Sequence, residues 1–302
     1  MFKKYAQLMI VWTLVIIFAL LTSTALTPVI TEEFDLYHSY EYSQMYLEDE
    51  PYSELVIEYD YQEGAEPSED AIFELERKVE KYTEKDSIKS VMGNEIPFND
   101  TATRSPYDRN DISELRDSYR SYEREGDTIS IYVLYLNGTW AERKGTLGIA
   151  DRPYTIGIFL GEIYSVTEET NLKREDIEPS VLVHEFGHLL ALVGIGYESD
   201  HEHPDPRYSN HCDESEGPCV MSGSLEIKEE MDEKPPLEFC QLCEQDIEYI
   251  RNKEAPFGIQ DLISFSVIIL QFSLGMWVSM AIIRSKHKKN KKYKGFSYDY
   301  YE

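Results

Sequence analysis

Cysteine is scarce in this chain, and all of it lies late in the sequence. The 302 residues include four cysteines, at positions 212, 219, 240 and 243. The first two thirds of the chain therefore offer no thiol that could act as a switch on a site further along. A catalytic thiol is not expected either, because no activating arrangement for one is visible. The four cysteines indicate a structural role.

Basic residues are also few. The chain has 29 Lys and Arg against 57 Asp and Glu, a formal net charge of −28. Nine of the basic residues but only three of the acids lie outside residues 31–260, so that region carries a formal charge of −34. Such a surface is typical of a solvated exterior in acidic or salty surroundings, and it would equally suit cationic peptides. The sequence alone does not separate these interpretations.

Long apolar runs are confined to the two ends of the chain. Residues 8–30 are almost wholly apolar after a short basic start, which predicts a signal anchor or a cleavable signal peptide. Ser23 and Ala25 are small residues at a plausible cleavage spacing. Residues 263–283 contain no charged residue and are long enough to cross a bilayer as a helix. Two membrane spans are therefore expected, over 1–30 and 261–283.

A basic cluster directly follows the second apolar run. It consists of Arg284, Lys286, Lys288, Lys289, Lys291, Lys292 and Lys294. Because basic residues beside a span favour the cytoplasmic side, residues 284–302 are expected to form a cytoplasmic tail, with residues 31–260 outside the cell membrane. The position beside a span accounts for the cluster, so we expect no nucleic-acid partner. Sequons at Asn99 and Asn137 are compatible with an external domain.

Between the two apolar runs, the pattern predicts a stalk and one globular domain. Residues 31–50 are rich in Tyr and acids without an apolar period, which indicates a stalk before a domain over 51–256. Apolar and β-branched runs predict strands at 55–59, 87–92, 128–136 and 155–163. Helical spacing predicts helices after Ser68, after Asp111 and over 238–252. The expected fold class is α+β.

The most informative stretch is an H-E-x-x-H motif inside an apolar, helical segment. His184 and His188 are four residues apart, so both imidazoles lie on one face of a helix and can bind one metal ion. Glu185 is placed to act on a metal-bound water without being a ligand. Zinc in catalytic sites binds three protein ligands and keeps a fourth position for water. Pro179 suits the first turn of this helix, which is expected to run to about Val193.

Two histidines hold zinc poorly, so a third ligand must come from elsewhere. The candidates are His201, His203, His211, Asp200, Asp205, Glu226, Glu229 and Glu230. The neighbourhood of His211 favours it over the others, and a solvated loop is the preferred interpretation for His201 and His203. A glutamate ligand would indicate a different class of zinc protease, the gluzincins.

The residues around His211 carry a family resemblance. His211-Cys212, Cys219-Val220-Met221 and Cys240-Gln241-Leu242-Cys243 follow the H-E-x-x-H motif. This pattern resembles the metzincin zinc proteases and, in its cysteines, the archaemetzincins. The resemblance implies a mixed sheet, an active-site helix, His211 as third ligand and a C-terminal helix. It also implies that Met221 packs beneath the metal and that the four cysteines hold a second, structural zinc ion. In an external domain the same cysteines could equally form two disulfides.

The chain departs from the metzincin pattern directly after the motif. The family has glycine three residues after the second histidine and the third histidine three residues later, whereas Ala191 and Gly194 stand there in this chain. His211 follows His188 only after 22 intervening residues. The motif helix is therefore expected to continue until Gly194 or Gly196 turns the chain.

These observations predict a membrane-anchored, zinc-dependent endopeptidase acting on peptides or proteins outside the cell. Glu185 would take a proton from the zinc-bound water and deliver it to the departing amine. The strand at 155–163 could offer an edge to an extended substrate. Two alternatives stay open: another membrane zinc protease of gluzincin type, and a zinc-stabilised surface module without catalysis.

Overall fold

The computed structural model describes residues 12–13, 15–17, 19–23, 39–98, 105–151, 153–193, 203–213, 217–223, 233–252 and 259–295. The chain divides into two compact units. One contains residues 38–255, and the other contains residues 1–37 and 256–302. Each unit is a separate body and is treated separately below.

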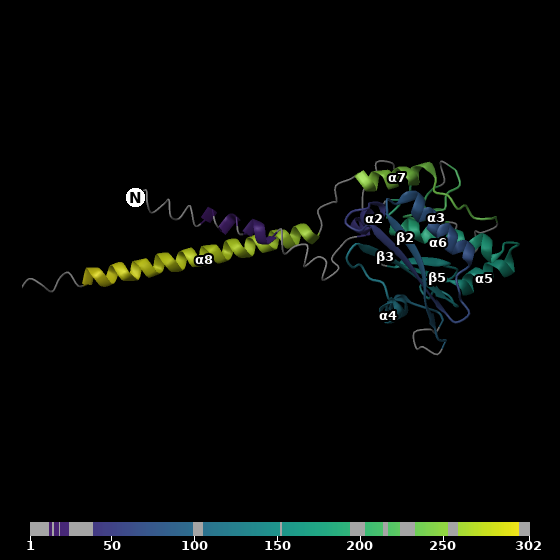
Figure 1. Cartoon of the computed structure of the whole chain (residues 1–302), viewed down its shortest axis with the longest axis horizontal. Helices are drawn as coiled ribbons and strands as arrows, with labels where there is room; N and C mark the ends of the chain where they lie inside the picture. The colour runs from purple at the N-terminus through teal and green to yellow at the C-terminus, as the bar shows by residue number, and fades with distance from the viewer. Residues whose placement is uncertain are drawn as a thin grey trace, which may run out of the picture. The chain divides into compact units, whose positions relative to one another are not determined.

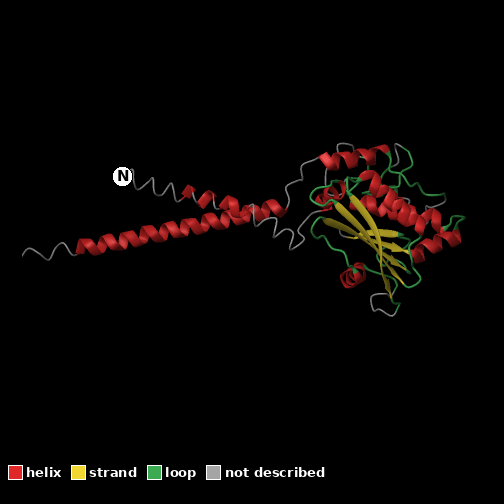
Figure 2. Ribbon diagram, viewed as in Figure 1, coloured by secondary structure: helices red, strands yellow, loops and turns green. Residues whose placement is uncertain are grey.

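A five-stranded mixed sheet forms the centre of the 38–255 unit (Figure 2). The strands are β1 (Glu54–Gln62), β2 (Ser87–Ile96), β3 (Thr128–Leu136), β4 (Gly148–Asp151) and β5 (Thr155–Phe159). Their order is β2-β1-β3-β5-β4; the first four are parallel, and β4 pairs antiparallel with β5. Central strands β1 and β3 are buried along nearly their whole length, as expected where helices cover both faces. The strands predicted at 55–59, 87–92 and 128–136 are confirmed.

Helices cover both faces of this sheet (Figure 1). Crossover helices α3 (Glu69–Tyr82) and α4 (Arg109–Tyr119) join the parallel strands and lie on opposite faces in the view of Figure 1. Helix α6 (Arg174–Leu189) packs beside α3 on the face away from α4, and α7 (Gln241–Asn252) lies on that side too. Strands and helices alternate from α2 to β3, and after β4 and β5 the remaining described elements are helices. The arrangement is a mixed α/β fold, and the mixed sheet expected with the α+β class is present.

Several element boundaries differ from expectation for local reasons. Strand β5 ends at Phe159, and α5 (Leu160–Glu169) takes up the rest of the apolar run assigned to a strand. The capping box before α4 uses Asp108 as cap and Asp111 as its third residue, one turn earlier than predicted. Ser68 caps α3 as predicted, with its hydroxyl accepting from Ala71 N–H at 3.2 Å. Helix α7 begins at Gln241, three residues later than predicted, because residues 233–240 have no regular secondary structure.

The expected stalk is partly a folded helix. Helix α2 (Ser39–Leu47) belongs to the 38–255 unit, and its Tyr46 is fully buried. Ser43 donates from its hydroxyl to the Leu189 carbonyl at 2.9 Å, at the end of the motif helix. The Lys85 ammonium donates to the carbonyls of Met45 and Glu48 near the end of α2. The sequence did not predict this helix, because its repeated tyrosines give little difference between an apolar and a polar face. The prediction of a stalk is therefore wrong for residues 39–50. Residues 31–38 of the predicted stalk lie outside the described part of the chain.

The second unit is built around α8 (Ile259–Gly295). Within the described residues one helix is long and apolar enough to cross a membrane, over Ile263–Met280. Described residues of the N-terminal segment contact it: Trp12 stacks on Phe272 at 6.1 Å between ring centroids. Most of residues 8–30 lie outside the described part, so two spans are not supported here and the first stays an expectation.

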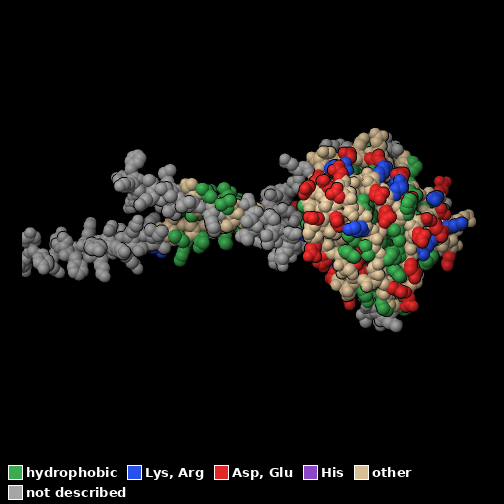
Figure 3. All heavy atoms as spheres, in the orientation of Figure 1, with side chains coloured by type: hydrophobic (Ala, Val, Ile, Leu, Met, Phe, Trp, Pro, Cys, Tyr) green, Lys and Arg blue, Asp and Glu red, His purple; other side chains and the backbone are tan. Residues whose placement is uncertain are grey.

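Acidic side chains are spread over the face of the 38–255 unit seen in Figure 3, with fewer basic ones between them. This distribution agrees with the excess of acids counted in the sequence. The charge is not gathered into one patch in this view. It therefore fits a solvated exterior at least as well as a binding surface for cations.

Candidate metal centres

Helix α6 presents the H-E-x-x-H motif. His184 and Glu185 are each 1% exposed, and His188 is half-buried. The two Nε2 atoms of the histidines are 3.1 Å apart, so both point at one place. His184 Nδ1 lies 2.6 Å from the Val220 carbonyl oxygen. Because a carbonyl only accepts, Nδ1 carries the proton and the Nε2 lone pair is left for a metal ion.

His211 joins this pair from a distant segment. It lies on 203–213, and its ring centroid is 5.2 Å from that of His184 and 5.0 Å from that of His188. Its Nδ1 donates to the Ser209 carbonyl at 3.2 Å, so its Nε2 too can bind a metal. One donor nitrogen from each of the three rings lies within 4.8 Å of the others. The three histidines could therefore hold one ion.

The other candidate ligands are not part of this group where they are described. His203 lies in a different cluster, and Asp205 accepts from the backbone N–H and guanidinium of Arg207. Five candidates lie outside the described residues, and the structure does not place them: Asp200, His201, Glu226, Glu229 and Glu230.

The motif helix begins and ends earlier than expected. It starts at Arg174, so Pro179 lies inside it and not in its first turn. It ends at Leu189, with Ala191 in the left-handed region at φ 58°. Ala191 N–H donates to the His188 carbonyl and Leu192 N–H to that of Gly187, the pair of hydrogen bonds of a Schellman ending. Ala191 itself thus makes the turn expected of Gly194 or Gly196.

Replacing Ala191 with glycine is expected to stabilise the protein. A residue with a Cβ is strained in the left-handed region by roughly 1 kcal/mol, and glycine is not. We expect Ala191→Gly to raise the free energy of unfolding by about 1 kcal/mol in urea titrations. Ala71→Gly, the same change at a buried position in the first turn of α3, should lower it by a similar amount. A loss of stability in both variants would contradict the strain at Ala191.

Met221 packs directly against the motif helix. It is fully buried, and a Cβ on Gly187 would lie 2.2 Å from its Sδ. Gly187 lies between His184 and His188 in the motif, so Met221 packs against the motif helix at that point. Only glycine allows the thioether to approach this closely. The sequence contained the signal, a glycine inside the motif, but its partner could be known only from the fold.

Glu185 faces the edge strand of the sheet. A Cβ on Gly148 of β4 would lie 2.8 Å from the Glu185 Oε1 atom. Among the described residues β4 pairs on one side only, with β5. The carboxylate therefore lies, buried, against the edge strand of the sheet. Both β4 and Gly148 were missed from sequence, because four residues without alternation carry no strand signal.

The four cysteines form a second cluster, with free thiols. The Sγ atoms are 3.5 Å apart for Cys212 and Cys240 and 3.6 Å apart for Cys219 and Cys243. These separations are well beyond the S–S bond length of about 2.05 Å. His203 Nε2 lies 3.4 Å from Cys243 Sγ. The solvated loop preferred for His203 from sequence is wrong, because its side chain is buried.

The two clusters share short stretches of backbone. His211 of the first is adjacent to Cys212 of the second, and Cys219 is followed by Val220 and Met221. Cys212 N–H donates to the Met221 carbonyl at 2.7 Å, which ties these two stretches together. A ligand or contact that fixes the cysteines would therefore also position two parts of the first cluster. These are the Val220 carbonyl, which accepts from His184, and the ring of His211.

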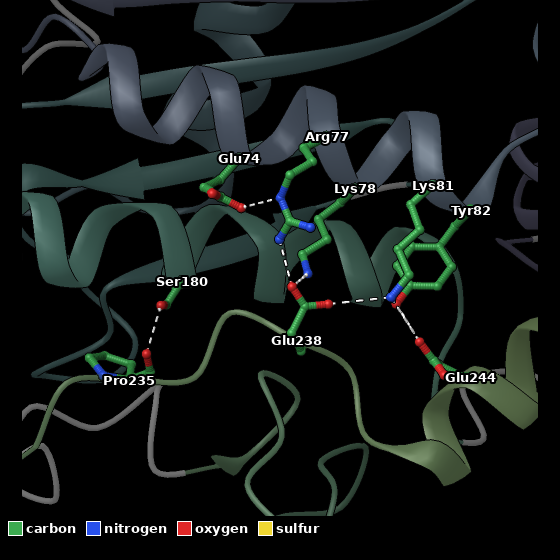
Figure 4. Close-up of polar contacts among 9 residues, drawn as sticks. All are labelled: Glu74, Arg77, Lys78, Lys81, Tyr82, Ser180, Pro235, Glu238 and Glu244. Carbon is green, nitrogen blue, oxygen red and sulfur yellow. Dashed lines mark hydrogen bonds and ion pairs between the residues drawn. The ribbon is translucent and has the colours of Figure 1, made fainter.

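Ion pairs to α3 anchor this region from the other side (Figure 4). The Glu238 carboxylate contacts Lys78 and Arg77 at 2.6 Å and Lys81 at 3.4 Å. Although burial opposes it, hydrogen bonds from Lys78 and Arg77 lower the pKa of Glu238 to about 2. The Glu238 carbonyl accepts from Val220 N–H at 2.9 Å. A basic face of α3 thus helps to hold Val220, whose carbonyl orients His184.

The fold and the two clusters define a mixed α/β protein with two potential metal centres. No family model matches the chain, and no curated protein matches it. Among solved structures, archaemetzincin from Methanopyrus kandleri is similar, with 18% identity and a TM-score of 0.42. The match covers 67% of this chain and 97% of that one. At this level of similarity, the assignment of a function depends on the residues of the site.

Proposed function

We propose that this protein is a zinc-dependent peptidase, with zinc held by His184, His188 and His211. The observation that carries the proposal is the convergence of three imidazoles from two distant segments, with the buried Glu185 beside them. Three nitrogen ligands and an open fourth position are the composition of a catalytic zinc site. A purely structural site has no need of an acid at position 185.

The donor set fits zinc by its chemistry. Nδ1 of His184 and of His211 each donates to a backbone carbonyl, which leaves the Nε2 lone pairs of both rings for the ion. Bound there, zinc supplies a Lewis acid that polarises a carbonyl group and makes water more acidic.

The protein's own acid–base step is assigned to Glu185. Its carboxylate takes a proton from the water that attacks the scissile carbonyl carbon, and it then gives that proton to the departing amine nitrogen. Burial between α6 and β4 keeps this carboxylate in one place, where it needs no reorganisation during the reaction.

An extended peptide is the proposed substrate, bound along β4. The expectation that residues 155–163 provide the edge is wrong, because β5 is paired on both sides, with β3 and with β4. Strand β4 pairs on one side only within the described part of the chain, and Gly148 brings it against Glu185. A peptide added as a further strand would therefore pass close to the proposed base.

Gly148→Ala tests this placement. The added methyl group would lie 2.8 Å from Glu185 Oε1 and must displace the carboxylate. We expect kcat on an extended peptide to fall by about 10- to 100-fold with zinc content unchanged, since a shift of ~1 Å in a catalytic group costs on this scale. Gly157→Ala in β5 is the control, because the nearest atoms to its Cβ are side-chain carbons of Ile149 and Ile112 at 3.2 Å or more. Equal kcat in the two variants would overturn the role of β4.

The proposed location is a membrane, with the 38–255 unit outside the cell. Supporting observations are the apolar helix Ile263–Met280 and the basic residues that follow it in sequence. In intact cells, added protease should degrade an epitope inserted after Gly126 and spare one at the C-terminus. Protection of both epitopes, or degradation of both, would contradict this orientation.

A further inference from the structure

Two arginines lie against one tyrosine beside the three-histidine group. The guanidinium carbons of Arg143 and Arg207 are 5.7 Å and 5.1 Å from the ring centroid of Tyr208. The same ring meets His211 edge to face, with 6.5 Å between the two ring centroids. Both arginines are exposed, whereas Tyr208 is half-buried. A pair of cations therefore lies one aromatic ring away from a proposed zinc ligand.

The ring of Tyr208 is held in place by its surroundings. A Cβ on Gly223 would lie 2.6–2.8 Å from three atoms of Tyr208, so the tyrosine packs directly on the backbone of Gly223. The Asp205 carboxylate accepts from the backbone N–H of Arg207 at 2.7 Å and from that of Tyr208 at 3.4 Å. Asp205 N–H donates to the His211 carbonyl at 2.7 Å. The turn that carries the tyrosine is thus closed on the histidine itself.

Arg143 reaches this ring from the loop that leads into β4. Just after it, Gly145 turns the chain at φ 81°, and the Gly145 N–H lies 3.4 Å from an oxygen of the buried Glu162 carboxylate. Strand β4 begins three residues further on at Gly148, which lies against Glu185. A peptide that is added along β4 and passes Glu185 would therefore continue, in one direction, towards Arg143.

The charge at this ring is opposite in sign to that of the whole chain, which is −28. Glu142, next to Arg143 in sequence, contacts Arg109 at 3.4 Å. Asp205 contacts Arg207 at 3.2 Å. The two guanidiniums at Tyr208 and this one carboxylate together carry a formal charge of +1. Because salt screens charges beyond about 8 Å, a ligand at the ring meets this charge more strongly than the distant acids.

A carboxylate is the group that fits these arginines. A guanidinium has five N–H donors in a planar fork that matches a carboxylate, and contact with an aromatic ring through its face leaves the N–H groups at its edge. An extended peptide rises about 3.3 Å per residue. An Asp or Glu within about three residues of the scissile bond would therefore come within reach of the ring and its arginines.

We propose that Arg143 and Arg207 select peptides with Asp or Glu within about three residues of the scissile bond. This inference rests on the proposed peptidase function and names its substrate class. It is the opposite of the preference for cationic peptides that the charge of residues 31–260 suggests. Arg143 is the main specificity-determining residue, because Arg207 already contacts Asp205.

Peptides that differ at one position test this preference. Glu, Gln or Lys is placed in turn at each of the three positions on either side of the scissile bond, and the full-length, zinc-loaded protein is assayed. At one or more positions kcat/KM should be about fivefold higher for Glu than for Gln, the upper range for an exposed ion pair, and lower again for Lys. Arg143→Glu should invert this order, so that the Lys peptide is cleaved best.

Lys89→Glu is the matched control. It makes the same change in charge at an exposed side chain of β2, at the other edge of the sheet from β4, and should keep the preference for Glu. Equal kcat/KM for the three peptides at every position would overturn the inference. The same order of peptides in the Arg143→Glu variant and its control would also overturn it.

Binding separates this inference from the peptidase function. In the Glu185→Ala background, fluorescence anisotropy of labelled peptides should give a lower Kd for the Glu peptide than for the Lys peptide. Adding Arg143→Glu should reverse the two values. If this selectivity is present but the unmodified protein cleaves none of the peptides, the peptidase function fails and the carboxylate-binding role of Arg143 remains. If neither binding nor cleavage distinguishes Glu from Lys, the inference is wrong whatever the activity.

Discussion

Glu185→Ala is expected to abolish peptide cleavage while zinc stays bound. Because Glu185 is placed as the base and not as a ligand, its loss removes proton transfer but none of the three imidazoles. Groups in this role contribute about 10²- to 10⁴-fold to rate, so kcat should fall by that factor. The measurements are cleavage of an extended peptide and zinc per chain by elemental analysis.

Glu175→Ala provides the matched control for this variant. Glu175 is an exposed acid in the first turn of the same helix, so its loss changes the charge equally and leaves the site alone. Its kcat should stay close to that of the unmodified protein. Equal cleavage by the Glu185→Ala variant and its control would end the peptidase proposal, even if both bind zinc.

Two adjacent substitutions should have different effects on zinc content. His211→Ala is expected to lower zinc from about two ions per chain to about one, because only the three-histidine group loses a ligand. Cys212→Ser should lower it towards zero. Cys212 belongs to the second cluster, and it also anchors the stretch that carries His211 and bonds to Met221. Cleavage should be lost in both variants.

Elemental analysis of the full-length protein, with circular dichroism to check folding, distinguishes the possible results. An unchanged zinc count in the His211→Ala variant would rule out His211 as a ligand. If Cys212→Ser lost a single ion and kept full activity, the two centres would be independent, in contradiction to the backbone they share. The coupling is expected because metal binding and local folding are linked in such sites.

Local patterns predicted the central strands and the position of the motif. Apolar runs such as 128–136 predict buried strands because both faces of a parallel sheet are covered. Helices and strands whose sequences lack a clear alternation of apolar and polar residues were not predicted. Strand β4 is only four residues long, and α2 is rich in tyrosine. Their positions depend on what packs against them: β5 for the strand, α6 and α7 for the helix.

The end of the motif helix illustrates a different limit. The absence of glycine at position 191 predicted a longer helix, because alanine is a strong helix former. The chain nevertheless turns at Ala191, where the Schellman hydrogen bonds hold a left-handed alanine. Contacts at the helix end, including the Ser43 hydroxyl on the Leu189 carbonyl, outweigh the local preference. The helix propensity of one residue contributes less to the free energy of folding than tertiary packing does.

The sequence by itself determined what depends on local geometry. His184 and His188 share a helix face because they are four residues apart, and Glu185 follows from the same spacing. Tertiary structure alone decided which distant residues complete each centre. Connections of 14 residues to His203 and of 22 residues to His211 are both long enough to reach the motif, so chain length alone does not distinguish the two histidines. The fold places His211 beside the motif and His203 among the thiols, because Cys212 and the Met221 stretch are held between α6, α3 and α7.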